Sequence, residues 1–261
     1  EKSKDKEINI SYNDILSKST SLLNLFLHVF RKVEDNIIII FNKNKEEKYI
    51  DILKIIIELN LDIIETSSDI FNLINHLRQL RKNALFLINN ENIFKSKEKT
   101  IYDQYINSLI NLLRKNIYNE QLCLEIIKTF SSFANYNKDI CTLLIKKGFI
   151  KLVFQFLNNT NNSQLVSESI QLIKNICFSS QKNLITLANQ NILNILFEIH
   201  IKFINENKII NNIDLIVNEI KKLPGQGVHI EDILLNAIKN FNQNIKNNFN
   251  NNDVKFKLLN D

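Results

Sequence analysis

One stretch of the sequence repeats itself after 43 residues, and this internal repeat constrains the fold more than any other feature. Residues 121–127 (QLCLEII) align with residues 164–170 (QLVSESI), and residues 149–154 (FIKLVF) align with residues 192–197 (ILNILF) at the same offset. The segments between them align at an offset of 44, which is one residue of loop slippage. A period of this length indicates a helical repeat, in which each unit can bury its apolar faces only against a neighbouring unit.

The chain is also poor in the residues that make tight turns. Its 261 residues include three Gly and one Pro. Folds with many tight turns depend on these two residues, so the composition predicts long helices joined by polar links, with Asn in place of Gly at most links. Gly148 lies between two aligned segments, where it is expected to supply the left-handed cap of a sharp helix junction. Each repeat unit is therefore expected to hold a short, a medium and a long helix.

The pattern also predicts how the chain divides. We expect a charged lead-in over residues 1–9, a single helical domain over residues 10–246 and a polar, Asn-rich tail over residues 247–261. The clearest repeat units are expected at residues 101–148, 149–191 and 192–223. Further helices are expected over about residues 10–30, 50–59 and 63–87, and a final one over residues 228–245. The third of these is expected to break near Thr66, where Ser68 or Asp69 would cap the next helix.

The repeat resembles the armadillo family. Units of that family have a Gly, then Ile-x-x-Leu-Val-x-Leu-Leu, a polar gap, and a long helix that ends in Leu-x-Asn-Leu. This chain has Gly148 followed by FIKLVFQFL, and then IQLIKNIC at residues 170–177. The resemblance is good over residues 101–200 and weaker over residues 50–100. It implies an all-α fold, a right-handed α-solenoid of armadillo- or HEAT-like three-helix repeats with helical caps.

The resemblance also implies a binding groove. In armadillo proteins the third helix of each unit lines the concave side, and an Asn near its end holds the backbone of an extended peptide. Those positions are Asn83, Ser132 and Asn175 in this chain. The positions one and two turns earlier are the remaining groove candidates: Gln79, Lys128, Gln171, His76, Glu125 and Glu168. The alternative interpretation of all nine residues is an ordinary solvated helix face.

The chain departs from the family in one important way. Nuclear-import adaptors of the armadillo family place Trp one turn before the Asn, where it holds basic peptides, and this chain contains no Trp. A basic import signal is therefore not the expected ligand. The mixture of His, Lys, Glu and Gln instead predicts a mixed polar partner segment.

Motifs for catalysis are missing from the sequence. The four His are scattered, without the HExxH spacing of a zinc site, and GxSxG does not occur. The segment PGQG at residues 224–227 lacks the Gly-Lys-Ser/Thr of a phosphate loop, so it is interpreted as a helix stop. Cys123, Cys141 and Cys177 lie among apolar residues, which predicts buried free thiols and a reducing compartment. We expect no enzymatic activity, no cofactor and no metal.

The predicted function is a non-catalytic scaffold or adaptor that binds a protein or peptide partner in the groove. The net charge of +5 is spread along the chain, which argues against nucleic acid, and no apolar run approaches the ~18 residues of a membrane span. The expected location is the cytoplasm, with the nucleus as the alternative. Two other functions stay open: a regulatory domain of a larger cytoskeletal, trafficking or small-GTPase assembly, and a helical-repeat RNA-binding module.

Overall fold

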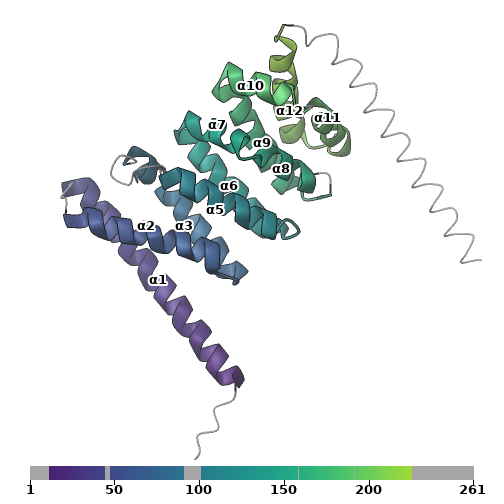
Figure 1. Cartoon of the computed structure of the whole chain (residues 1–261). Helices are drawn as coiled ribbons and strands as arrows, with labels where there is room; N and C mark the ends of the chain where they lie inside the picture. The colour runs from purple at the N-terminus through teal and green to yellow at the C-terminus, as the bar shows by residue number, and fades with distance from the viewer. Residues whose placement is uncertain (1–11, 45–47, 91–100, 158, 191, 225–261) are drawn as a thin grey trace, which may run out of the picture. The chain divides into compact units, whose positions relative to one another are not determined.

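The computed structural model describes residues 12–44, 48–90, 101–157, 159–190 and 192–224, and these residues are helical without a strand among them (Figure 1). The predicted all-α class is therefore confirmed. The chain forms two compact units, residues 1–79 (unit 1) and residues 80–261 (unit 2). The predicted lead-in, the final helix over residues 228–245 and the tail lie outside the described residues.

Unit 1 contains α1 (Tyr12–Asn44), α2 (Lys48–Thr66) and the first half of α3 (Ile70–Asn89). Helices α1 and α2 form an antiparallel pair (Figure 1). Their buried positions recur every three or four residues, as expected for one apolar stripe per helix: Leu27, Phe30 and Phe41 on α1, and Leu53, Ile56 and Ile64 on α2. The predicted break is confirmed, because α2 ends at Thr66 and the Asp69 carboxylate accepts a hydrogen bond from the amide of Asn72 at 3.1 Å.

A second stripe on the same two helices is apolar but exposed. Its members on α1 are Phe26, Val29, Val33 and Ile40, and those on α2 are Ile52, Ile55 and Leu59. Each member comes one residue before a buried position of its own helix, which is a rotation of about 100°. Because the two helices run in opposite directions, the same rotation turns both stripes to the same side of the pair. We call this surface the exposed apolar face.

Unit 2 begins with the second half of α3, and its described residues form eight further helices. These are α5 (Ile101–Lys115), α6 (Glu120–Tyr136), α7 (Lys138–Lys146), α8 (Phe149–Leu157), α9 (Ser163–Ser179), α10 (Gln181–Ala188), α11 (Ile192–Lys202) and α12 (Asn207–Lys221). The long helices α6, α9 and α12 pack in succession (Figure 1). Aromatic rings pack between the long and the short helices: Phe130 of α6 contacts Phe149 of α8 edge-on, with ring centroids 5.0 Å apart.

The links between the helices depend on polar side chains, as the composition predicts. Asn119, Asn137 and Asn162 each accept a hydrogen bond from the backbone amide two or three residues ahead, so they cap α6, α7 and α9. Gly148 has φ of 74°, which confirms the predicted left-handed junction between α7 and α8. These local signals set where α6, α7 and α9 begin and where the chain turns from α7 into α8.

Candidate functional site

Polar side chains connect the three long helices of unit 2. Lys174 donates to the Asn212 Oδ1 at 2.8 Å, and Asn212 donates to the Gln171 Oε1 at 3.1 Å. Gln171 then donates to the Asn175 Oδ1 at 2.9 Å, and Asn175 donates to the Asn135 Oδ1 at 2.9 Å. We call this chain of hydrogen bonds from α12 through α9 to α6 the amide ladder. All of its donors point in one direction along the chain, so each bond polarises the next.

The ladder contacts between different helices join residues that are 38, 40 and 41 positions apart in the sequence. Equivalent residues of adjacent sequence repeats are 43 positions apart, but the side chains that contact each other are fewer positions apart in the sequence. Asn135 and Asn175 are 40 residues apart, and so are Glu168 and Lys208, which form an ion pair at 3.4 Å. The difference is about one helical turn, because a side chain reaches the residue one turn nearer the N-terminus of the next helix.

Five of the nine predicted groove residues lie half-buried on α6 and α9. They are Lys128, Ser132, Glu168, Gln171 and Asn175. Gln171 and Asn175 belong to the amide ladder, while the Ser132 hydroxyl donates to the backbone carbonyl of Lys128 at 3.1 Å. Sequence reasoning missed the other ladder members, Asn135, Lys174 and Asn212. They could have been found by pairing each long-helix residue with the residue one helical turn before its equivalent in the next repeat.

The other four predicted residues are buried. The Glu125 carboxylate on α6 forms an ion pair with Arg81 of α3, and Asn83 lies on the same half of α3. His76 and Gln79 belong to unit 1, where Gln79 donates to the carboxylate of Asp35. Burial leaves these four side chains little surface to offer a ligand. Their role in binding stays a prediction.

His76 has an unusual environment. Its side chain is 1% exposed, and neither ring nitrogen has a hydrogen-bond partner among the described residues. Burial, and then the positive charge of Arg31, lower the pKa of His76 to about 4, although the backbone of Asn60 lies close enough to oppose the shift. The imidazole is therefore neutral at physiological pH.

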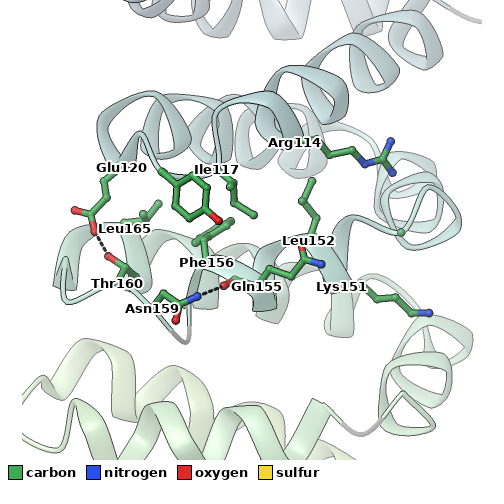
Figure 2. A pocket seen from close by; sticks show the side chains of 12 residues that line it. Arg114, Ile117, Glu120, Lys151, Leu152, Gln155, Phe156, Asn159, Thr160 and Leu165 are labelled. Atoms are coloured by element: carbon green, nitrogen blue, oxygen red, sulfur yellow. Dashed lines mark hydrogen bonds between the residues drawn. The ribbon is translucent and has the colours of Figure 1, made fainter.

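A cleft of about 940 Å³ lies elsewhere in unit 2. It is formed by the end of α5, the link from α5 to α6, helix α8 and the link from α8 to α9 (Figure 2). Its lining residues are Arg114, Ile117, Tyr118, Glu120, Gly148, Lys151, Leu152, Gln155, Phe156, Asn159, Thr160 and Leu165. None of the nine groove residues lines the cleft, so it is a separate surface from the amide ladder.

The three cysteines are free and buried. Burial raises the pKa of Cys123 and of Cys177 to about 12, so both thiols stay protonated and unreactive at neutral pH. Within the described parts of the chain, no group of three or more His, Cys, Asp or Glu is placed to hold a metal ion. No described helix has the length and apolar character needed to cross a membrane.

Comparisons of the chain with protein families, with curated proteins and with solved structures found no match. The functional argument therefore depends on the residues and their geometry.

Proposed function

We propose that the chain is an armadillo-like helical repeat protein, and that it acts as a non-catalytic scaffold or adaptor in the cytoplasm or nucleus. Its partner would be an extended protein segment that lies across α6, α9 and α12. The observation that supports this function most directly is the amide ladder, which places side-chain amides of three successive helices in one hydrogen-bonded row. The free buried thiols fit a reducing compartment.

Side-chain amides suit an extended peptide, because each carries both a donor and an acceptor, as the peptide backbone does. The ladder uses one of the two N–H donors of the half-buried Asn175, so this side chain keeps a second donor for a ligand carbonyl, whereas Asn212 is buried. Packed helices lie about 8–10 Å apart, and an extended chain advances about 3.3 Å per residue. A bound segment would therefore meet one helix about every three residues.

The charges beside the ladder favour a mixed polar segment. Lys128 on α6 and Lys174 on α9 bring positive charge, while Glu168 and Lys208 pair with each other at 3.4 Å. The excess of positive charge is therefore small, since it comes from Lys128 and Lys174 alone. This supports a partner selected by its backbone and by single polar side chains, and not by a long basic or acidic run.

Selection of peptides from a random display library on the immobilised 261-residue chain would supply a ligand for the test. The double variant Asn135→Ala with Asn175→Ala should raise the dissociation constant of a selected peptide about thirtyfold, since two hydrogen bonds are worth about 1 kcal/mol each. Asn211 is an exposed residue of α12 outside the ladder, so Asn211→Ala is the matched control. Unchanged affinity in the double variant, with helicity retained, would reject binding on this face.

A further inference from the structure

One contact of the repeat differs between the junction at the cleft and the next junction. At the junction of α8 and α11, Lys202 donates to the backbone carbonyl of Thr160 at 2.7 Å and bridges the two repeats. With the offset of 43, the residue equivalent to Lys202 in the preceding repeat is Asn159, and the residue equivalent to Thr160 is Ile117. Asn159 is too short for this bridge and donates to the carbonyl of Gln155 in its own helix at 2.9 Å (Figure 2). The space between these repeats is open.

The floor of the cleft is apolar. Leu152 and Phe156 of α8 and Leu165 of α9 lie there with less than a tenth of their surface exposed. Tyr118, also a lining residue, is 94% exposed, which is unusual for a large aromatic side chain. A ligand with a large apolar group would cover both the floor and the Tyr118 ring, and aromatic rings of this kind are frequent energetic centres of protein interfaces.

The charges of the cleft are separated. Glu120 lies at one end, where the Thr160 hydroxyl and the Asn162 amide donate to its carboxylate. Arg114 and Lys151 lie at the other end (Figure 2). Both are exposed, and no ion pair involving either is found in the described parts of the chain; Arg114 donates only to the Asn111 Oδ1, at 3.3 Å. This end is therefore suited to an anionic group.

We propose that the cleft is a second binding site, and that it takes a partner-protein segment in which large apolar side chains are followed by acidic residues at one end. The apolar side chains cover the floor and Tyr118, while an acidic side chain pairs with Arg114 and Lys151. A protein segment fits better than a small molecule because the cleft is open to solvent and a chain can enter and leave it. The site involves α5 and α8, so it does not depend on the amide ladder.

The test uses a fluorescent ten-residue peptide with leucine and phenylalanine in one half and acidic residues at the other end, and a second peptide in which lysines replace the acidic residues. Fluorescence anisotropy with the 261-residue chain should show binding of the acidic peptide that weakens with added salt. Arg114→Gln with Lys151→Gln should weaken that binding at least about tenfold, which is a loss of about 1.4 kcal/mol.

Asn159→Lys is the decisive variant. It restores the residue type that bridges the next junction, so a bridge across the cleft should weaken binding of the acidic peptide at least about tenfold, even though the variant adds a positive charge. Asn189→Lys places the same charge on the exposed end of α10 and should leave the affinity unchanged. Asn135→Ala with Asn175→Ala should also leave it unchanged, which separates this site from the proposed groove.

Several results would overturn the proposal. They are full affinity in the Asn159→Lys variant, equal binding of the lysine-containing peptide, and no binding of the acidic peptide up to about 1 mM. Binding of sodium decanoate without binding of the acidic peptide would also overturn it, because the cleft would then be a small-molecule site. Circular dichroism of each variant shows that a lost affinity does not come from lost helices.

Discussion

Acidification should destabilise the chain through His76, because the folded state holds this side chain neutral. In the unfolded chain the pKa returns to about 6.5, whereas burial and Arg31 lower it to about 4 in the folded state. Between these two values the unfolded state binds a proton that the folded state does not. The stabilisation is therefore fully present above pH 6.5 and is lost as the pH falls toward 4.

The size of the effect follows from the two pKa values. The full shift of His76 corresponds to about 3 kcal/mol, since one pKa unit is about 1.4 kcal/mol. Between pH 7 and pH 5 the part that is lost is about 2 kcal/mol, because most of the unfolded chains but few of the folded ones are protonated at pH 5.

Urea unfolding followed by circular dichroism would measure this loss. The free energy of unfolding of the chain and of a His76→Leu variant should be compared at pH 7 and at pH 5. Carboxylates titrate in both proteins and cancel, so the difference between the two proteins should shift by about 2 kcal/mol toward the variant at pH 5. His28→Gln, on the exposed side of α1, controls for loss of any histidine. A difference that stays constant with pH would refute the reasoning.

Three further stability changes and one surface change can be measured on the same chain. Gly148→Ala should cost about 1–2 kcal/mol, because φ of 74° is strained for a residue with Cβ. Asn162→Ala should cost about 1 kcal/mol through loss of the cap of α9. Phe130→Ala should cost about 3–5 kcal/mol, since its ring is fully buried. Unchanged urea midpoints would contradict each of these expectations. Phe26→Glu with Val33→Glu should lower the binding of a hydrophobic dye to the exposed apolar face without lowering helicity; undiminished dye fluorescence would contradict this.

The helices of unit 2 could be predicted because their ends are set by local chemistry. Asn119, Asn137 and Asn162 cap helices with their own side chains, and Gly148 turns the chain with its own backbone. Such signals lie within a few residues of the structure that they determine, so the sequence displays them directly. The break before α3 was predictable for the same reason, because Asp69 caps it.

The contacts between helices were harder to predict. Alignment places Glu125 and Glu168 at equivalent positions at an offset of 43, and His76 and Glu168 at an offset of 92. However, His76 is buried in unit 1 and Glu125 is buried beside Arg81, while Glu168 is only half-buried. Equivalent sequence positions therefore do not have equivalent exposure. The cleft was not predicted because its lining residues come from separate segments, and their meeting depends on how the helices pack. A sequence alignment pairs Lys202 with Asn159, but it does not show that Lys202 reaches the carbonyl of Thr160 in the preceding repeat whereas Asn159 bonds to the nearby Gln155.

The buried cysteines allow the opening of individual helices to be followed by the rate at which each thiol is labelled. Cys123 lies in α6, Cys141 in α7 and Cys177 in α9, so their thiols can react with an external disulfide reagent only after the surrounding helices open. If the helices of unit 2 open together, the three thiols should be labelled at one common rate. If the repeats open in sequence from an end, as a linear array allows, the three rates should differ in the order of opening. The labelling rates of the three native cysteines would therefore show whether the helices of unit 2 open together or one after another.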